Sequence, residues 1–460
     1  MTKASKLWSK KNKKEFSRSL LQKNPTTDVT SNKFNLLVIT QFFPPDYAAT
    51  GQLIQELAHN LGENNVQVNV FTGQPGYAFK QKLAPNKEIG KNLTIRRSRT
   101  VKIASSRIRA KAVSGIIFTL RATLTLLKNG RKNHVALLTT APPFLSIAGY
   151  VANLALGLEY ICLIYDLYPD AVVELGVTSQ DSFITKLWNK TNALVWQRSK
   201  RIVVLSETMK QRIINKHPSV ADKISVIHNW ADSDWIVPIQ KQENWFARQH
   251  GIDHKFTVLY SGNMGRCHDA DTIIKTIELL QNEPVQFVFI GAGTKHEVCR
   301  QTVAKLKLNN CIFLPYQDKT NLPYSLTACD LALVSIAPGL EGVVAPSKLY
   351  GIMAAGKAIA AICEPHSYLR EIVGDAKCGA CFDNENSQGL ADFIMNLATN
   401  PELAVEMGKA GRKYMVENFT PKIIAKQYCD VLNIDITGRS RNIQPPEAKH
   451  LIQDKLISEI

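Results

Sequence analysis

The sequence contains the same pattern twice: an aliphatic run of strand length, then a loop with glycine, then an amphipathic helix. The first copy is "NLLVITQFFPPDYAATGQLIQELAHNL", and the second begins at "FTVLYSGNMG" and continues into a helix from about Ala270. After each copy, further strand-like and helical runs alternate, from about Phe34 to Thr420. Such alternation is typical of parallel sheets covered by helices. The sequence therefore predicts an α/β chain with two parallel-sheet domains, for which its 460 residues are sufficient.

These patterns divide the chain into six segments. We predict a basic disordered arm (1–33), a first Rossmann-like domain (34–230), a linker with little periodicity (231–254), a second Rossmann-like domain (255–418), a C-terminal helix that packs back on the first domain (419–435), and a polar tail (436–460). Ligands of open parallel sheets bind beyond the carboxyl ends of the strands. We therefore expect the two domains to face each other across a cleft lined by the loops after their strands.

Positive charge is concentrated in the N-terminal third of the chain. The formal net charge is +17, yet residues 1–33 hold nine Lys and Arg against two acidic residues, and residues 80–132 hold fifteen against one. The rest of the chain is therefore slightly acidic. A surface of this kind favours an anionic partner, which could be nucleic acid, anionic lipid or a phosphorylated acceptor.

Two apolar segments of the first domain could contact a membrane. Residues 101–128 combine apolar residues at helical spacing with basic ones, which suits either an interfacial helix at an anionic membrane or an ordinary helix packed on the sheet. Residues 133–158 contain no Asp, Glu, Lys or Arg, but Pro142 and Pro143 interrupt them. The apolar helix that remains has about 15 residues, fewer than the roughly 20 that span a bilayer. We expect it to be buried or monotopic.

The cysteines indicate a reducing compartment. There are nine, an odd number, mostly within apolar stretches, and no secretory signal precedes them. Cys378 and Cys381 have C-x-x-C spacing without a second pair or a histidine cluster, so a turn beside a strand is favoured over zinc. The sequence predicts reduced thiols, no metal site and a cytoplasmic location.

Two basic residues of the second domain indicate an anion site. In "PSKLYGIMAAGKAIA", Lys348 occupies the first turn of an expected helix of two to three turns, where a cation is unfavourable by roughly 0.3–1 kcal/mol unless an anion offsets it. In "SGNMGRCHDAD", Gly262 and Gly265 allow close backbone approach and Arg266 supplies a fork-shaped anion partner. The two together predict a diphosphate site. A surface helix with a solvated lysine remains the alternative.

Candidate acid–base groups lie in the first domain. The stretch "YDLYPD" places Asp166 and Asp170 just beyond a strand, where a carboxylate could accept the proton of an acceptor hydroxyl. Either residue could instead be a helix-capping or turn aspartate. His228, in "IHNWAD", is favoured as a histidine with satisfied core hydrogen bonds.

Seven motifs occur in an order that resembles one family. They are "PPDYAATGQLIQELA", "VFTGQPGY", "YDLYPDAVVELGV", "VIHNWAD", "YSGNMGRCHDADTI", "FIGAG" and "APSKLYGIMAAGKAI". The chain resembles, over roughly Phe34 to Thr420, bacterial family 4 retaining glycosyltransferases of GT-B fold, of the type that builds capsular and exopolysaccharide repeat units. The resemblance implies two Rossmann-like domains across a cleft, a nucleotide-diphosphate sugar as donor, with a UDP-sugar favoured, and no bound metal or other cofactor.

The same resemblance implies roles for individual residues. Gly51 would approach the donor phosphate, Arg266 and Lys348 would hold the diphosphate, and Ser347 would cap the helix beneath it. Gly291 and Gly293 would let the nucleotide lie close, and further donor contacts would come from Gly262, Asn263 and Gly265. Asp166 stands where many relatives carry an active-site residue, so we take Asp166, Arg266 and Lys348 as the catalytic candidates.

One departure from the family concerns a pair of glutamates. The family commonly has two, eight positions apart, and the second binds the ribose hydroxyls. Here Gly351 occupies that second place, and Glu341 lies ten residues before it. Glu341 is retained as a donor-binding candidate, whereas the chain offers no carboxylate at the ribose position.

The function predicted from these observations is transfer of a sugar to a lipid-linked or glycan acceptor in polysaccharide biosynthesis. The first domain would face the acceptor and, through residues 80–132, an anionic membrane on the inner face of the cytoplasmic membrane. A sugar-nucleotide epimerase of the same fold is one alternative. The other is a polyanion-binding protein without catalysis, although no nucleic-acid-binding signature is present. A dinucleotide dehydrogenase is disfavoured because "GAG" lacks the G-x-G-x-x-G turn.

Overall fold

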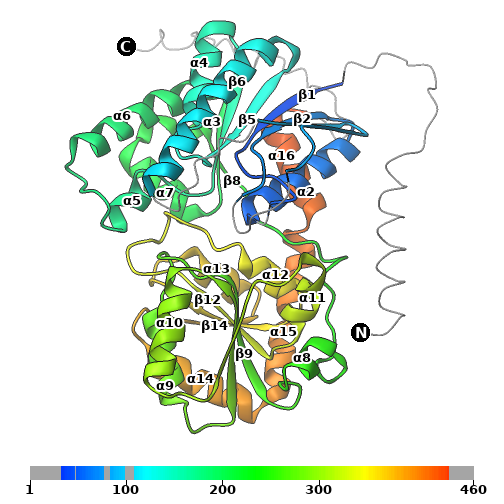
Figure 1. Ribbon diagram of the computed structural model, residues 1–460, viewed down its shortest axis with the longest axis vertical. Helices are drawn as coiled ribbons and strands as arrows, with labels where there is room; N and C mark the ends of the chain where they lie inside the picture. The colour runs from blue at the N-terminus through cyan, green and yellow to red at the C-terminus, as the bar shows by residue number, and fades with distance from the viewer. Residues whose placement is uncertain (1–32, 47, 77–82, 99–107, 435–460) are drawn as a thin grey trace, which may run out of the picture.

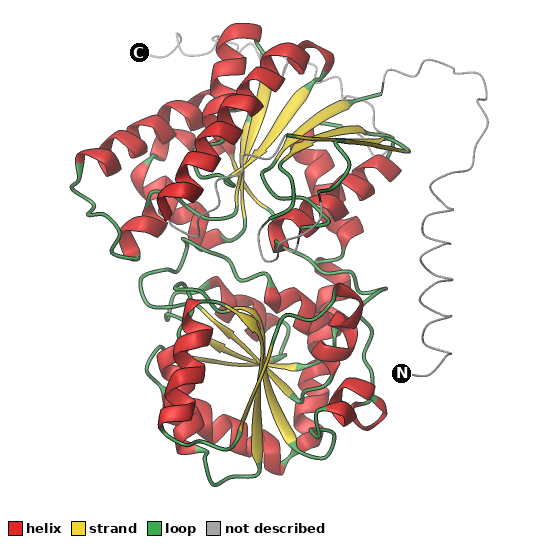
Figure 2. Cartoon of the chain, in the orientation of Figure 1, coloured by secondary structure: helices red, strands yellow, loops and turns green. Residues whose placement is uncertain are grey.

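The chain folds into two α/β domains, one above the other in Figure 1, and helices cover both faces of each sheet (Figure 2). The structure is a computed structural model that describes residues 33–46, 48–76, 83–98 and 108–434. The predicted arm (1–33, apart from Lys33) and the predicted tail (436–460) lie outside these residues. No helix in the described part of the chain is long and apolar enough to cross a membrane.

The N-terminal domain is built on an eight-stranded sheet in the order β3-β4-β2-β1-β5-β6-β7-β8. All neighbouring strands are parallel except the hairpin of β3 and β4. The strands are β1 (Asn35–Ile39), β2 (Gln67–Thr72), β3 (Lys87–Gly90), β4 (Leu93–Arg97), β5 (Val135–Thr139), β6 (Glu159–Ile164), β7 (Arg201–Val204) and β8 (Ile224–Val226). The helices are α2 (Ala49–Glu63), α3 (Ile108–Asn129), η1 (Gly130–Lys132), α4 (Ser146–Leu156), α5 (Asp170–Glu174), α6 (Phe183–Arg198), α7 (Glu207–Lys216) and η2 (Pro218–Lys223).

The C-terminal domain is built on a six-stranded, all-parallel sheet in the order β11-β10-β9-β12-β13-β14. The strands are β9 (Phe256–Asn263), β10 (Val285–Ala292), β11 (Cys311–Leu314), β12 (Leu331–Ser335), β13 (Ala358–Ile362) and β14 (Gly379–Phe382). The helices are α9 (Ala270–Leu279), α10 (Thr294–Lys305), η4 (Lys319–Asn321), α11 (Leu322–Thr327), α12 (Lys348–Ala354), α13 (Tyr368–Asp375), α14 (Ser387–Thr399) and α15 (Pro401–Asn418).

The central strands are apolar along their whole length because helices cover both of their faces. Every residue of β5, β12 and β13 is buried, and their sequences are VALLT, LALVS and AIAAI. One hydrophobic cluster continues across both domains, from Leu37 of β1 to Val343 and Leu349 beside α12. The two domains are therefore packed against each other through part of a shared core.

The strand orders fix where ligands can bind. In each sheet the order reverses direction at one point, between β1 and β5 in the N-terminal domain and between β9 and β12 in the C-terminal domain. Open parallel sheets bind ligands beyond the carboxyl ends of the strands at such reversals. Gly262 lies at the end of β9 and Arg266 in the loop after it, and the loop after β12 leads to Lys348. The topology therefore brings the two predicted anion-binding residues to the same edge of the sheet.

The last described helix, α16 (Pro421–Leu432), returns to the N-terminal domain. Thr420 caps it by accepting a hydrogen bond from the Ile423 amide, and Pro421 occupies its first turn, where no amide donor is needed. Its apolar face joins the core around β1, β2 and α2 through Ile424, Ala425, Tyr428, Cys429 and Leu432. In Figure 1 this helix, in orange-red, lies beside α2.

The segment expected to be a plain linker (231–254) contains two short helices, η3 (Lys241–Glu243) and α8 (Trp245–Gln249). Phe246 and Ala247 of α8 are buried in the core, and Asn244 caps the helix. A helix of five residues is shorter than the window over which helical periodicity can be recognised. The sequence pattern therefore missed it.

Candidate functional site

The candidate site lies where loops of the two domains meet at the carboxyl ends of their strands. Asp166 lies two residues beyond the end of β6 and forms an isolated antiparallel bridge with Val344 of the loop between β12 and α12. The Leu167 amide donates a hydrogen bond of 2.8 Å to the Val343 carbonyl. Asp166 of the N-terminal domain therefore lies against a loop of the C-terminal domain. This loop carries Glu341 and leads to Lys348.

The side chain of Lys348 is turned inward, toward β9. Its Nζ donates a hydrogen bond to the Tyr260 hydroxyl and lies 3.9 Å from the centre of the Tyr260 ring. Although part of the residue is exposed, the ammonium group is enclosed, and burial lowers the pKa of Lys348 to about 7. The alternative of a solvated surface lysine is therefore wrong. An enclosed ammonium with a lowered pKa gains free energy when an anion binds beside it.

The helix that begins at Lys348 has the expected length. We predicted two to three turns behind Pro346 and Ser347, and α12 has seven residues, Lys348–Ala354, or about two turns. Ser347 stands at the N-cap position, yet its side chain makes no capping hydrogen bond, so the predicted cap is not formed. Its backbone is helical rather than extended, which turns the hydroxyl away from the first amides. Anion binding here would depend on the lysine side chain more than on the helix.

His268 is a neighbour of Lys348 that sequence reasoning missed. Its Nδ1 lies 2.9 Å from the Ser335 carbonyl at the end of β12. Burial and the adjacent Lys348 charge lower the pKa of His268 to about 3, so the imidazole is neutral at pH 7. No spacing pattern singles out this histidine. Its position, two residues after Arg266 in the loop that follows a strand, is the signal that could have identified it.

The end of β9 brings Gly262 to Lys348, and the loop that follows leaves Arg266 exposed. Gly262 has φ = 115°, and a Cβ built there would lie 3.9 Å from Lys348 Cε. Asn263 and Arg266 are exposed, Gly265 is half-buried, and Arg266 makes no hydrogen bond or ion pair with another described residue. The guanidinium is thus available to an anion at the same edge of the sheet as Lys348.

The glycines of "IGAG" are required by close contacts between neighbouring backbones. Gly291 and Gly293 have φ values of 133° and 136°. A Cβ on Gly291 would lie 2.2 Å from the Gly262 carbonyl oxygen, and one on Gly293 would lie 2.3 Å from the Met264 carbonyl oxygen. The missing side chains let the ends of β9 and β10, and the residues that follow them, approach each other. A ligand contact through their backbones stays a prediction.

Gly51 is likewise pressed against protein backbone. It lies in the first turn of α2, and a Cβ there would come within 2.9 Å of the Phe42 carbonyl. The loop after β1 therefore folds over the start of α2. The structure places Gly51 at the strand-order reversal of the N-terminal domain, where a phosphate contact remains a prediction.

Asp166 has an environment suited to proton transfer. Its backbone amide and that of Tyr165 both donate to the Thr140 hydroxyl, at 3.3 and 3.1 Å, which fixes the loop after β6 against the loop after β5. Burial raises the pKa of Asp166 to about 6. The Cys267 thiol has a pKa of about 11, raised by burial and then by the Asp166 charge. The Asp166 carboxylate is therefore close enough to Cys267, next to Arg266, for its charge to be felt there.

The other two polar candidates of the first domain have structural partners. The Asp170 carboxylate is buried and accepts from Arg212 and Lys216 at 3.1 and 2.6 Å, so it is not free to act on an acceptor. His228 Nδ1 lies 3.4 Å from the Tyr350 hydroxyl, and its ring packs against Phe419. His228 therefore has the core role that the sequence favoured.

Glu341 is buried against the N-terminal domain, with a side chain that is only partly satisfied. The residue is 2% exposed, and its Oε1 accepts a 2.6 Å hydrogen bond from the Thr208 hydroxyl of α7. Its Oε2 has no hydrogen-bond partner among the residues that the structure describes. Gly351 lies on α12 next to Leu326 and offers no carboxylate for a ribose.

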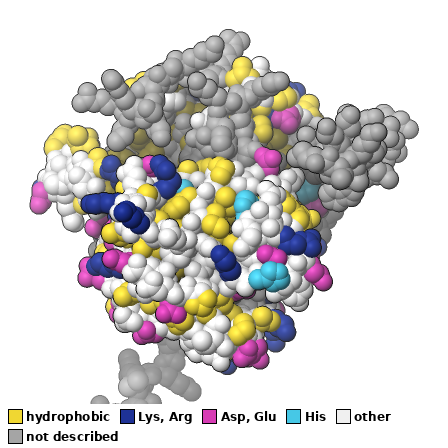
Figure 3. Space-filling model, turned by 60° about the horizontal axis from the view of Figure 1, so that its bottom comes forward, with side chains coloured by type: hydrophobic (Ala, Val, Ile, Leu, Met, Phe, Trp, Pro, Cys, Tyr) yellow, Lys and Arg dark blue, Asp and Glu magenta, His cyan; other side chains and the backbone are white. Residues whose placement is uncertain are grey.

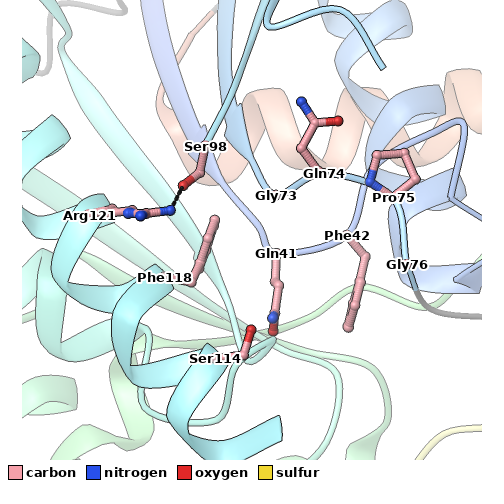
Figure 4. Close-up of a pocket in the computed structure, with 10 residues that line it drawn as sticks. All are labelled: Gln41, Phe42, Gly73, Gln74, Pro75, Gly76, Ser98, Ser114, Phe118 and Arg121. Atoms are coloured by element: carbon pink, nitrogen blue, oxygen red, sulfur yellow. Dashed lines mark hydrogen bonds between the residues drawn. The ribbon is translucent and has the colours of Figure 1, made fainter. Parts of the chain in front are cut away.

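A cavity of about 210 Å³ lies in the N-terminal domain, beyond the carboxyl ends of β1 and β2 (Figure 4). The Gln41 side chain points toward Ser114, and Arg121 donates a 3.1 Å hydrogen bond to Ser98. Gln41 follows β1, two strands away from β6 and Asp166, which corresponds to about 10 Å at the usual strand spacing. Polar side chains, one cation and aromatic rings line this cavity. The lining residues include Gln41, Gln74, Ser98, Ser114, Phe118 and Arg121.

The arrangement can stabilise a leaving diphosphate with fixed positive charge. One edge of the sheet carries the enclosed Lys348, the exposed Arg266 and the backbone amides after β9. In many active sites, preorganised charge of this kind makes the largest single contribution to stabilising the transition state. Within the described ranges, no group of three or more His, Cys, Asp or Glu residues is arranged to hold a metal ion. All nine cysteines are free thiols.

Family models match both halves of the chain. Residues 50–235 match Glycosyltransferase Family 4, and residues 241–414 match Glycosyl transferases group 1. Among curated proteins, the chain is similar to the probable glycosyltransferase WbjE of Pseudomonas aeruginosa, with 25% identity over 327 residues, covering 70% of this chain and 80% of the relative. It is also similar to the putative colanic acid biosynthesis glycosyl transferase WcaI of Escherichia coli K12, with 22% identity, covering 88% of this chain and 100% of the relative.

Solved structures share the fold at low sequence identity. Sucrose-phosphate synthase from Thermosynechococcus elongatus superimposes with a TM-score of 0.71 and 15% identity, covering 87% of this chain and 98% of that one. Anabaena Alr3699/HepE in complex with UDP and glucose gives a TM-score of 0.65 at 15% identity, covering 86% and 99%. The predicted fold of two Rossmann-like domains is confirmed.

Proposed function

Because the chain belongs to the glycosyltransferases of GT-B fold, with a family 4 domain followed by a group 1 domain, we propose that it transfers a sugar from a nucleotide-diphosphate sugar, with retention, to a lipid-linked or glycan acceptor in polysaccharide biosynthesis. The observation that carries this proposal is the enclosed Lys348 beside Gly262 at the strand-order reversal, opposite Asp166 of the other domain. The likeness to WbjE and to WcaI, whose name includes colanic acid biosynthesis, supports the pathway class.

In this proposal the diphosphate of the donor lies at Lys348 and Arg266. The bond between the anomeric carbon and the diphosphate oxygen breaks, and the two cations stabilise the charge that develops on the leaving oxygens. Asp166 contacts the sugar or the acceptor, and its pKa of about 6 leaves the carboxylate mostly ionised at pH 7 and able to accept a proton. A UDP-sugar is the favoured donor, in line with the UDP bound in the HepE structure.

The acceptor enters from the N-terminal domain. The cavity beside Gln41 and Arg121 offers amide, hydroxyl and aromatic groups, which suit a saccharide, and a guanidinium that suits an attached negative charge. Its position about 10 Å from Asp166 fits an acceptor longer than a single sugar unit.

Membrane attachment of the N-terminal domain is the second part of the proposal. The predicted helix of residues 101–128 is α3 from Ile108 onward; it buries Phe118, Ala122 and Leu126 but exposes a stripe of Val113, Ile116, Leu120 and Leu124. Helix α6, which packs on α4 as α3 does, exposes Phe183, Ile184 and Leu187 beside Lys186 and Lys190. Exposed apolar groups next to cations favour an anionic bilayer surface. The side chains of Arg107, Arg109 and Lys111 lie outside the described residues.

The face of the C-terminal domain that Figure 3 shows has charges of both signs. In this view, which brings the bottom of Figure 1 forward, the basic side chains in dark blue are mixed with acidic ones in magenta. The N-terminal domain would therefore attach while the donor-binding domain faces the cytoplasm.

A donor screen tests the enzymatic proposal. UDP-, GDP- and ADP-sugars are tested for binding by calorimetry, and for hydrolysis and transfer by release of the nucleoside diphosphate. We expect binding of one of them with loss in the Lys348→Met variant. Binding followed by release of an epimerised sugar would favour the epimerase, and failure of every nucleotide sugar to bind would refute both enzymes.

Liposome co-sedimentation tests the membrane proposal. We expect binding that requires anionic lipid, weakens with salt and falls in the Leu120→Asp, Leu124→Asp double variant. The matched control is Leu279→Asp, which alters an exposed leucine on α9 of the C-terminal domain. Equal binding to neutral and anionic vesicles, or none to either, would favour a soluble acceptor.

A further inference from the structure

The loop between β12 and α12, residues 336–347, belongs to the C-terminal domain but is held by the N-terminal domain. Arg212 of α7 donates from Nη1 to the backbone carbonyls of Gly339 and Glu341, at 3.1 and 2.9 Å. Backbone contacts of Asp166 and Leu167 hold Val344 and Val343 of the same loop. The loop that presents Glu341 is therefore shaped by residues of the other domain.

Arg212 is itself fixed on its far side. Its Nε donates to Asp170 Oδ1 at 3.1 Å, and its Nη2 donates to Glu174 Oε1. One planar guanidinium thus bridges two carboxylates of the α5 segment and two carbonyls of the C-terminal domain. A lysine has the same charge but only a single nitrogen, which cannot reach all four acceptors.

Thr208, one turn before Arg212 on α7, fixes the carboxylate of Glu341. Its hydroxyl donates to Oε1 at 2.6 Å. Gly342 has φ = 72°, and a Cβ there would lie 2.7 Å from the Thr208 carbonyl oxygen, so the loop lies directly on the start of α7. The second oxygen, Oε2, is buried and has no partner within the described part of the chain. A buried carboxylate oxygen without a partner is costly unless a ligand supplies a donor.

We propose that Arg212 and Thr208 are positioning residues that orient Glu341 toward a hydroxyl of the donor sugar, so that the sugar part of the donor site is complete only while the two domains are in contact. The inference rests on the proposed function. It assigns to the N-terminal domain a part in recognising the sugar, while the diphosphate is held by Lys348 and Arg266 of the C-terminal domain. Binding of the nucleoside diphosphate and binding of the sugar then depend on different residues.

Two variants and one matched control test this. Arg212→Lys keeps the charge but loses the fork, and Thr208→Val removes only the hydroxyl while keeping the shape of the side chain. Lys216→Met is the control, because Lys216 pairs with the same Asp170 at 2.6 Å but donates no hydrogen bond to the loop. For each protein we measure the melting temperature, the affinity for UDP, the affinity for the UDP-sugar identified in the donor screen, and kcat.

We expect both positioning variants to bind UDP within twofold of the wild type, to bind the UDP-sugar about tenfold more weakly, and to lose at least tenfold in kcat. Lys216→Met should lower the melting temperature at most and leave affinity and kcat unchanged. In Glu341→Gln, the further change Thr208→Val should have little effect, since residues that act through one group are not additive.

Other results would contradict the proposal just as clearly. Loss of UDP affinity together with the UDP-sugar, or equal losses in Lys216→Met, would show a general structural role and overturn the proposal. Wild-type kcat in Thr208→Val would do the same. A wild-type protein that binds no nucleotide sugar at all would instead overturn the proposed function, so the two failures are distinguishable.

Discussion

Nucleotide binding should take up a proton at Lys348. Burial lowers the pKa of this ammonium to about 7, so about half of the Lys348 side chains are neutral at pH 7 and about 99% at pH 9 in the free protein. A diphosphate beside Nζ favours the charged form and raises the pKa again. The bound state therefore holds more protons than the free state, and affinity must fall as pH rises above 7.

The size of the effect follows from the charged fraction. If only the ammonium form binds, the affinity for UDP falls about fiftyfold between pH 7 and pH 9, or about 2 kcal/mol. At pH 8 about 0.9 proton is taken up for each UDP bound. Below pH 7 the side chain is already charged, and Lys348 adds little further dependence. His268, whose pKa is about 3, stays neutral throughout this range.

Isothermal titration calorimetry in buffers of different ionisation enthalpy measures the proton uptake directly. Lys348→Met should bind weakly and take up no proton. The matched control is Lys357→Met, which removes another buried lysine with a lowered pKa. Lys357 precedes β13, so it lies at the opposite edge of the sheet and should not affect uptake. Constant affinity from pH 7 to 9 in the wild type, or unchanged uptake in Lys348→Met, would refute this reasoning.

Four further outcomes are expected. Arg266→Ala should weaken UDP binding by about 1.5–3 kcal/mol in calorimetry, as expected for a lost charged hydrogen bond, and unchanged affinity would remove it from the site. The wild-type rate should fall below pH 6 as the Asp166 carboxyl, with its pKa of about 6, becomes protonated, and Asp166→Asn should lack this acidic limb in a pH–rate profile. Gly293→Ala should lower the free energy of unfolding in urea by about 1–3 kcal/mol because its Cβ would meet the Met264 carbonyl, whereas Gly374→Ala, which meets nothing within 4 Å, should not. Turnover should survive EDTA; complete loss, restored by magnesium or manganese, would contradict the fixed-cation mechanism.

The fold was predictable because it depends on local patterns. Alternating apolar strands and amphipathic helices occur along the whole chain, and each pattern is visible within a short window. The order of the strands then follows from the few topologies that parallel sheets allow. The exception was a short element, the five-residue α8 in the expected linker, whereas α12 has seven residues, about the two turns expected.

The candidate site was predictable in composition but not in arrangement. Arg266 and Lys348 could be proposed from residue type and from their places after strands. The sequence could not show that Tyr260 and His268 enclose Lys348, because these neighbours come from β9 and the loop after it, 80 or more residues away along the chain. The role of the glycines in "IGAG" was also hidden, since their close contact is with the neighbouring strand-end loop.

By itself, the sequence determined the two α/β domains, the edges of the sheets where ligands can bind, and the basic character of the N-terminal third. The tertiary structure alone decided how these parts act on one another. Arg212 and Glu341 are 129 residues apart, yet one hydrogen bond joins them across the two domains. Burial, and with it the lowered pKa of Lys348 and the raised pKa of Asp166, arises only when distant segments exclude water from the same place. Local patterns carry no information about which segments those are, because desolvation depends on the packing of the whole chain.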